Sequence, residues 1–253
     1  MIKLIASDID GTLLPYGHTE LVEGLFEVVG RLMRRGVRFC PASGRDINNL
    51  RKMFAPIRSE CCFICENGTM VYDRQQLVSR TTMPREAVIA IARDILAMGG
   101  GVFISRDDGE HYYCHMPDIE ELSQHVRFID DPEEIEGNII KITACSEKDI
   151  LKFDRALRPR WCGRYDVALA GQVWLDFTAT NKGAALRGLA DHLGIGMDEV
   201  AAFGDNWNDR TMLEAAGTAY LMEGADDALR RLFPKSCRSV VEVLERLERG
   251  EDI

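Results

Sequence analysis

Two carboxylates, Asp8 and Asp10, stand one residue apart near the start of the chain, shortly after the mostly apolar run 2–6. A short apolar run bounded by a glycine turn, here Gly11, is typical of a buried parallel strand. Residues i and i+2 of a strand point to the same side, so both acids would crowd its carboxyl end. Such a site favours a hard cation such as Mg²⁺, with one aspartate as nucleophile and the other moving protons. A surface Asp-x-Asp-Gly turn is the alternative for this segment taken alone.

Three further segments carry polar groups that would suit the same site. These groups are Ser43, Gly44, Lys182, Asp205, Asn208 and Asp209. Open α/β sheets bind ligands at the carboxyl ends of their strands, so we expect the groups to meet in one crevice. A carboxylate nucleophile, oxygen ligands for a cation and donors for phosphate oxygens together indicate phosphoryl transfer. Each segment by itself is equally compatible with an ordinary turn, a helix N-cap or a solvated lysine.

The elements that must position these groups alternate between strand and helix at both ends of the chain. Apolar spacing predicts helices at 20–35, 46–53, 182–193, 210–216, 225–233 and 239–249. The predicted strands are 2–7, 37–42, 62–65, 69–72, 200–203 and 218–222, with a hairpin-like turn at 66–68. This alternation predicts an α/β fold whose core is a doubly wound parallel sheet.

The pattern changes between Pro84 and Thr178. In this stretch the spacing predicts helices at 85–98, 117–126 and 147–157 and strands at 101–105, 111–115, 139–144, 165–168 and 172–177. Such an order suits an α+β domain with a largely antiparallel sheet. We therefore expect a core split into residues 1–83 and 179–253, with residues 84–178 inserted as a second domain.

Composition narrows the possible partners and the compartment. The net charge of -10 argues against a nucleic-acid or anionic-membrane surface but not against a phosphorylated ligand held by a cation. No leader pattern and no apolar run of about 20 residues is present, so we expect a cytoplasmic protein, as a monomer or small homo-oligomer. Of the eight cysteines, Cys62 and Cys65 have C-x-x-C spacing without a second ligand pair. We expect reduced cysteines that pack in the core.

Taken together, four segments resemble the motifs of the haloacid dehalogenase superfamily. They are Asp8-Ile9-Asp10-Gly11-Thr12, Ala42-Ser43-Gly44-Arg45, Asn181-Lys182-Gly183 and Gly204-Asp205-x-x-Asn208-Asp209. The order of these motifs, with a large insert before the lysine motif, resembles that in Cof-type sugar-phosphate phosphatases with an α+β cap. This resemblance covers essentially the whole chain. The resemblance implies an enzyme, a phosphatase that needs Mg²⁺ and hydrolyses small phosphorylated metabolites, sugar or polyol phosphates first, through an aspartyl phosphate.

The resemblance also implies a role for each motif residue. Asp8 would attack phosphorus, and Asp10 would protonate the leaving oxygen and then activate water. Asp8, Asp205 and the Asp10 backbone carbonyl would bind Mg²⁺, with Asp209 orienting the site or binding through water. The phosphoryl oxygens would be held by the Ile9 backbone N–H, Ser43, Gly44, Lys182 and Asn208.

In such proteins the cap covers the leaving group, so its residues would set selectivity. The candidates are His111, Tyr112, His115, Arg164, Tyr165 and Trp174, about half of which we expect to serve packing instead, with Arg45 and Asn67 on the core side. Trp207 is expected to pack against the core. A departure from the branch pattern is Glu223, within Met222-Glu223-Gly224-Ala225, which adds a carboxylate near the crevice.

Two other functions stay open at this point. A phosphomutase acting on sugar phosphates would use the same motifs while shielding the aspartyl phosphate from water. A non-catalytic sensor of a phosphorylated ligand is disfavoured, because binding alone needs neither the nucleophile Asp8 nor the acid/base Asp10.

Overall fold

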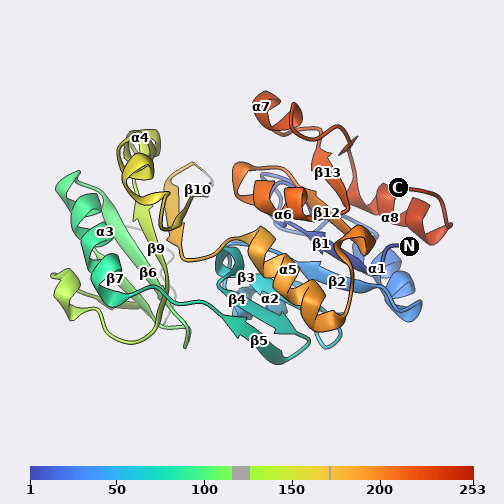
Figure 1. The fold of residues 1–253 in the computed structure, drawn as a ribbon, viewed down its shortest axis with the longest axis horizontal. Helices are drawn as coiled ribbons and strands as arrows, with labels where there is room; N and C mark the ends of the chain where they lie inside the picture. Colours follow the sequence, from blue (N-terminus) through green and yellow to red (C-terminus); the bar gives the residue numbers. More distant parts are fainter. Residues whose placement is uncertain (116–125, 171) are drawn as a thin grey trace. The chain divides into compact units, whose positions relative to one another are not determined.

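The computed structural model describes residues 1–115, 126–170 and 172–253. Two compact units make up the chain (Figure 1): Met1–Ser79 with Asn181–Ile253, called the core unit here, and Arg80–Thr180, called the inserted unit. The sequence-based prediction places these boundaries at 83/84 and 178/179.

The core unit is built on a parallel sheet with the strand order β14-β13-β12-β1-β2. The strands are β1 (Leu4–Ser7), β2 (Arg38–Pro41), β12 (Val200–Gly204), β13 (Thr218–Met222) and β14 (Ser236–Cys237). Every pair is parallel, and β1 lies between β2 and β12 (Figure 1). The chain thus leaves β1 towards one edge and later returns to its other side, which is the switch point where such sheets bind ligands. The prediction of a doubly wound α/β core is confirmed.

A small antiparallel sheet continues the core unit beyond β2. It contains β3 (Cys62–Cys65), β4 (Met70–Asp73) and β5 (Gln76–Arg80), and a bridge between Ala42 and Ile64 joins it to the parallel sheet. The predicted turn between β3 and β4 is a 3₁₀ turn at Glu66–Gly68. The sequence analysis missed β5, because its residues are mostly exposed and have no apolar alternation.

Six helices surround the sheet of the core unit in the described residues. They are α1 (Leu25–Arg34), α2 (Ile47–Met53), α5 (Lys182–Leu193), α6 (Arg210–Ala215), α7 (Asp227–Arg230) and α8 (Val240–Glu248). Two predicted helices were too long. The helix expected from residue 20 begins only after Gly24, whose φ of 80° is left-handed. The helix expected at 225–233 is capped by Asp226 and is one turn long, and Pro234 disfavours helical backbone at the residue before it.

In its described residues, the inserted unit is a six-stranded sheet with two α-helices on one face. Its order is β10 (Asp166–Ala170), β11 (Trp174–Thr178), β9 (Ile139–Cys145), β6 (Gly101–Arg106), β7 (His111–Cys114) and β8 (Val126–Phe128). Neighbours are antiparallel apart from β7 and β8. The helices α3 (Arg85–Ala97) and α4 (Ile150–Trp161) share one apolar cluster with the sheet. This arrangement confirms the α+β prediction.

Two helices expected in the inserted unit differ from the structure or fall outside its described residues. Most of the predicted helix 117–126 lies outside the described residues, and Val126 begins β8, which the sequence analysis missed. The helix expected at 147–157 begins at Ile150, because the Asp149 carboxylate caps it by accepting from the Lys152 N–H. It then runs past Pro159 to Trp161.

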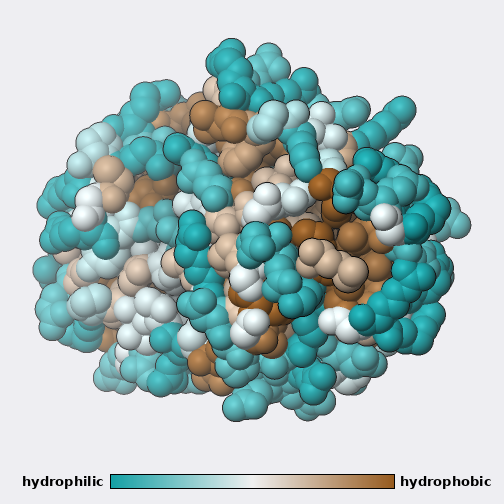
Figure 2. Space-filling view, turned by 45° about the vertical axis from the view of Figure 1, so that its right-hand side comes forward, coloured by the Kyte–Doolittle hydropathy of each residue, from teal (hydrophilic) through white to brown (hydrophobic). Residues whose placement is uncertain are grey.

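The polarity of the surface and the state of the cysteines can be compared with what the composition led us to expect. Figure 2 shows hydrophilic residues over most of the drawn face, with hydrophobic residues in smaller groups. In the part of the chain that the structure describes, no helix is long and apolar enough to cross a bilayer. The eight cysteines are free thiols, and all except Cys162 are buried.

Candidate active site

Three of the four motifs lie on loops at the carboxyl ends of β1, β2 and β12. Asp8 directly follows β1, and its N–H donates to the Phe203 carbonyl of β12 at 2.9 Å. Ser43 lies just beyond β2, and Asp205 directly follows β12. The parallel order β12-β1-β2 therefore brings three segments that are distant in sequence to one edge of the sheet.

Lys182 lies between two aspartates at this edge. Its Nζ donates to Asp8 Oδ1 at 2.5 Å and to Asp209 Oδ1 at 2.6 Å, and its side chain is fully buried. Asn181 begins α5 by accepting from the Ala184 N–H at 2.9 Å, which places Lys182 in the first helical turn. Gly183 permits this position, because a Cβ there would lie 2.2 Å from the Thr211 carbonyl oxygen. The close approach of α5 to α6 thus fixes the lysine.

Asp209 is bound through both of its carboxylate oxygens. While Oδ1 accepts from Lys182, Oδ2 accepts from the backbone N–H groups of Asp205 and Asn206, each at 3.1 Å. Gly204 lies against it so closely that a Cβ at residue 204 would be 2.6 Å from the Asp209 Cβ. Asp209 therefore orients the lysine and the loop that carries Asp205.

Asp205 is held by two hydroxyl groups from the first loop. Thr12 donates to its Oδ1 at 3.1 Å, and Tyr16 donates to its Oδ2 at 2.8 Å. The sequence analysis missed Tyr16, since an aromatic residue in a loop beyond the Asp-x-Asp motif carries no signal of this contact. The Tyr16 hydroxyl and Thr12 together set the orientation of the Asp205 carboxylate.

Carboxylate oxygens of Asp8, Asp205 and Asp209 lie within 4.8 Å of one another. Burial and Asp209 raise the pKa of Asp205 to about 6, and burial and Asp209 raise that of Asp8 well above its usual range, against the effect of Lys182. Three buried acids with one buried lysine leave negative charge uncompensated. This donor set fits a hard divalent cation such as Mg²⁺.

Asp10 lies outside that carboxylate group and pairs with Arg45. The guanidinium donates from Nε to Asp10 Oδ2 at 2.9 Å and from Nη2 to Asp10 Oδ1 at 2.6 Å, a bidentate contact. Its Nη1 also donates to Asn49 Oδ1 at 3.2 Å on α2. The side chains of Arg45 and Asp10 are 35% and 44% exposed, so the pair is open to solvent.

The second motif is joined to the turn that follows β3. The Ser43 N–H donates to the Ile64 carbonyl at 2.9 Å, and the Ser43 carbonyl accepts from the Asn67 N–H at 3.0 Å. Asn67 is buried with a left-handed φ of 55°, and its side chain lies against Gly44. These contacts place Asn67 where it orders the Ser43 loop.

In the fourth motif, Asn208 is half-buried within the 3₁₀ turn Trp207–Asp209. Trp207 is 41% exposed, so the expectation that it packs against the core was wrong. Asn206 caps this turn by accepting from the Trp207 N–H at 2.7 Å, and Asp209 at its end is fully buried. Ile9 has a fully buried side chain, which leaves only its backbone for contact with a ligand.

Comparison with known proteins tests this reading of the motifs. Residues 5–240 match the family model described as haloacid dehalogenase-like hydrolase. The chain belongs to this family. An HMP-PP phosphatase of Escherichia coli O157:H7 is 29% identical over 249 residues, which cover 92% of this chain and 89% of that enzyme. The resemblance to this superfamily stated from the four motifs is confirmed.

Solved structures share the fold over nearly the whole hydrolase. A haloacid dehalogenase-like hydrolase of B. subtilis has a TM-score of 0.84 at 20% identity, covering 97% of this chain and 100% of that chain. A sugar phosphatase of haloacid dehalogenase subclass IIB has a TM-score of 0.83 at 18% identity, covering 97% and 98%. At these identities the likeness concerns the fold.

The candidate residues of the inserted unit do not form one group. Tyr112 is buried in the apolar cluster, and Arg164 and Tyr165 lie against Trp161, with the guanidinium 4.7 Å from the ring centre of Trp161. His115 is exposed after β7, and Trp174 begins β11. His111 stacks on Phe103 with ring centres 4.8 Å apart.

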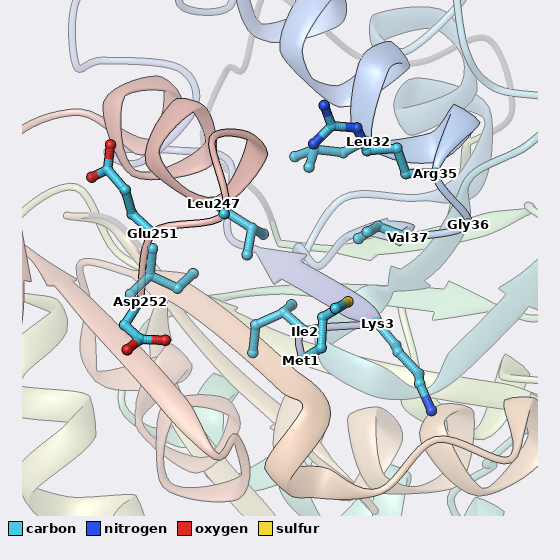
Figure 3. Close-up of a pocket in the computed structure, with 12 residues that line it drawn as sticks. Met1, Ile2, Lys3, Leu32, Arg35, Gly36, Val37, Leu247, Glu251 and Asp252 are labelled. Carbon is cyan, nitrogen blue, oxygen red and sulfur yellow. The ribbon is translucent and has the colours of Figure 1, made fainter.

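A cavity of about 790 Å³ opens at the other end of β1, away from Asp8 (Figure 3). Its lining comes from residues 1–3, from 35–37, from Leu32 and Leu247, and from the C-terminal residues 250–253. The basic groups there are already paired: Lys3 with Glu199 at 2.7 Å, and Arg35 with the Glu248 carbonyl. None of the four motifs contributes to this cavity.

Proposed function

We propose that this hydrolase is a Mg²⁺-dependent phosphatase that acts on small phosphorylated metabolites through an aspartyl phosphate on Asp8. Sugar and polyol phosphates are the first candidate substrates. The observation that carries the proposal is the buried contact of Lys182 with Asp8, beside the Asp205 and Asp209 carboxylates. A nucleophile, a cation site and a fixed ammonium group thus lie within reach of one phosphoryl group.

Asp8, Asp205 and the Asp10 backbone carbonyl would hold the ion, and the Asp209 carboxylate would keep Asp205 in place by accepting from the Asp205 backbone N–H. Bound Mg²⁺ supplies positive charge that offsets the charge on the phosphoryl oxygens. Thr12 and Tyr16 support this arrangement, because they fix both oxygens of Asp205.

In the first step a carboxylate oxygen of Asp8 attacks phosphorus, and the bond from phosphorus to the ester oxygen breaks. Asp10 gives that oxygen its proton, so the product leaves as an alcohol. In the second step Asp10 takes a proton from water, whose oxygen attacks the phosphorus of the aspartyl phosphate. Inorganic phosphate leaves and the Asp8 carboxylate is restored.

The remaining motif residues would hold the phosphoryl oxygens. Lys182 would donate from its ammonium group, Ser43 from its hydroxyl and Asn208 from its amide, and Ile9 and Gly44 from backbone N–H groups. Lysine suits this position as a compact charge. Arg45, through its bidentate contact, would keep the Asp10 carboxylate directed at the reacting oxygens.

Release of inorganic phosphate tests the proposal. A panel of sugar, polyol, nucleotide and cofactor phosphates is incubated with the protein in Mg²⁺ or in EDTA, beside Asp8→Asn as the matched control. We expect release in Mg²⁺ only, concentrated on one chemical class, and none from Asp8→Asn. Full activity after exhaustive chelation would overturn the metal assignment. Isomerisation of a sugar phosphate that depends on a sugar bisphosphate activator and proceeds without phosphate release would identify a mutase.

A further inference from the structure

Three consecutive residues between β3 and β4 of the core unit have left-handed backbone conformations. Their φ angles are 49° for Glu66, 55° for Asn67 and 104° for Gly68. This conformation is unfavourable for a residue that has a Cβ, so the chain is strained at the first two of these positions. Strain of this kind persists only where the surrounding structure holds it, and it is concentrated at functional sites. The three residues are called the left-handed turn here.

One side of the left-handed turn is hydrogen-bonded to the loop of the second motif. The Glu66 N–H donates to the Arg45 carbonyl and the Asn67 N–H donates to the Ser43 carbonyl, each at 3.0 Å. The Asn67 side chain lies against Gly44, because a Cβ on Gly44 would be 3.3 Å from Asn67 Oδ1. The turn therefore contacts three consecutive residues of that loop.

The other side of the left-handed turn lies against the start of α5. A Cβ on Gly68 would be 2.5 Å from the Asn181 carbonyl oxygen and 3.1 Å from the Ala185 Cβ, so glycine is needed for this approach. Asn181 is the N-cap of α5, and Lys182 is the first residue of this helix. One turn of three residues thus contacts both the loop of the second motif and the helix that carries the lysine.

Thr69 holds the left-handed turn from its buried side. The Thr69 side chain is fully buried, and its hydroxyl donates to the Glu66 carbonyl at 3.1 Å. The Thr69 N–H donates to the same oxygen at 3.4 Å. A buried hydrogen bond that is removed is not replaced by one to water, so the hydroxyl contributes to keeping the backbone of Glu66 in its strained conformation.

The direction in which the Ser43 hydroxyl can donate depends on the loop that the turn contacts. The Arg45 N–H donates to Ser43 Oγ at 3.2 Å, so this oxygen accepts from the backbone and its own proton can be donated to a ligand. Ser43 is 2% exposed and Lys182 is 1% exposed. Donors held in place before a ligand arrives stabilise charge on its oxygens without the cost of reorganisation.

We propose that the left-handed turn is a positioning element, which holds the phosphate-binding groups of Ser43, Gly44 and Lys182 in fixed places relative to one another. The inference rests on the proposed phosphatase function, because that function assigns the phosphoryl oxygens to these groups. The cation ligands Asp8 and Asp205 follow β1 and β12 instead. Loosening the turn should therefore weaken phosphate binding and leave the binding of Mg²⁺ nearly unchanged.

Thr69→Val and Thr69→Ser test this role without changing a group that would hold phosphate. Valine keeps the shape of the side chain and lacks the hydroxyl, whereas serine keeps the hydroxyl. Calorimetry measures the Kd of Mg²⁺ and the Kd of inorganic phosphate in the presence of Mg²⁺. Thr69→Val should raise the Kd of phosphate roughly three- to tenfold and lower kcat/KM for the best panel substrate at least about tenfold. Its Kd for Mg²⁺ should change less than about twofold, and Thr69→Ser should restore phosphate binding to within about threefold of wild type.

A destabilised variant elsewhere in the core unit separates positioning from a general loss of stability. Thr69→Val should lower Tm by about 2–4 °C. Val243→Ala is the control, because Val243 is 4% exposed on α8, which packs on α1 and carries none of the four motifs. It should lower Tm at least as much while changing both dissociation constants less than about twofold.

Two results would overturn the inference. One is a Thr69→Val protein with a lower Tm and an unchanged Kd for phosphate. The other is equal weakening of phosphate and Mg²⁺ binding, which is expected if the whole site is disturbed. If Thr69→Val does not fold, Asn67→Gly takes its place, since glycine adopts left-handed backbone readily and leaves the turn less restricted. Phosphate binding should then weaken at least about threefold, and unchanged binding would refute the role of the turn.

Binding of inorganic phosphate also distinguishes failure of this inference from failure of the proposed function, because it needs no turnover. Weaker phosphate binding in Thr69→Val, in a protein whose wild type releases no phosphate from any panel member, would support the turn and refute the phosphatase. Unchanged phosphate binding in Thr69→Val, in a protein whose wild type does release phosphate, would refute only the role of the turn. A wild type that neither binds nor releases phosphate would refute both.

Discussion

Replacing Lys182 with Met tests whether the buried ammonium group holds the two aspartates together. Methionine keeps most of the side-chain volume, so the loss should be electrostatic rather than a cavity. Burial alone would lower the pKa of Lys182, yet Asp209 and Asp8 raise this pKa above its usual value. The lysine therefore keeps its proton in the folded protein. Breaking a fully buried pair costs roughly 3–5 kcal/mol of unfolding free energy, and we expect that loss at pH 7.5 in EDTA. Lys3→Met, which removes a pair with a 55% exposed lysine, should cost less than about 1 kcal/mol.

The cost of Lys182→Met should also depend on pH. Without the ammonium group the folded-state pKa of Asp8, already raised, rises further above its unfolded value. A carboxyl with a raised pKa stabilises the fold at low pH and loses that contribution as pH rises. The difference between wild type and variant should therefore be smaller at pH 5 than at pH 7.5.

Urea unfolding of the full chain measures both effects, with an unchanged m value as the condition for comparing midpoints. A double-mutant cycle with Asp209→Asn should give a coupling energy of about 2–3 kcal/mol, because each single change leaves the other charge buried and unpaired. Costs that add within about 0.5 kcal/mol would refute a direct buried contact between Lys182 and Asp209.

Three other predictions follow from the same geometry. Asp8→Asn should abolish phosphate release without lowering Tm, because the buried Asp8 carboxyl with its raised pKa is costly to ionise; a large drop in Tm would show that its charge supports the fold. Mg²⁺ binding should release protons near pH 6 and few at pH 8, because the pKa of Asp205 is raised to about 6 and the ion needs the carboxylate. Calorimetry in buffers of different ionisation enthalpy measures the number of protons released. Equal proton release at both pH values would contradict the prediction. In the absence of metal, the Asp205 carboxyl stabilises the fold below its usual pKa of 3.8, and this contribution is lost as pH rises through about 6. Arg45→Met should slow turnover at least about tenfold while changing stability by less than about 1 kcal/mol, because its pair with Asp10 is open to solvent; unchanged kcat would remove Arg45 from the site.

The fold of the core unit could be predicted because each strand and helix has its own local pattern. The apolar strand before Asp8 and the helix that begins at Lys182 needed no knowledge of the rest of the chain. Errors arose where one residue decides the backbone, as Gly24 does for α1, or where pairing rather than composition makes a strand, as in β5. Each motif carries its charged and polar residues within a few positions of a strand end or helix start, so these candidates could be named from the sequence.

Hydrogen-bond and packing contacts between residues far apart in the sequence could not be predicted from sequence patterns. The Tyr16 contact with Asp205 spans 189 residues, and no pattern around Tyr16 indicates it. On the inserted unit, the candidates chosen for their aromatic or basic side chains include Tyr112, which faces the apolar cluster.

The central claim is a covalent phosphate on Asp8, and borohydride trapping tests it most directly. The protein is mixed with the best substrate and Mg²⁺, quenched during turnover and treated with borohydride, which reduces an acyl phosphate to an alcohol. The account predicts homoserine at residue 8 in the mass of the N-terminal peptide, its absence in EDTA, and no change at Asp10. Phosphate release with an unmodified residue 8 under the same quench, or homoserine at residue 10 instead, would contradict it.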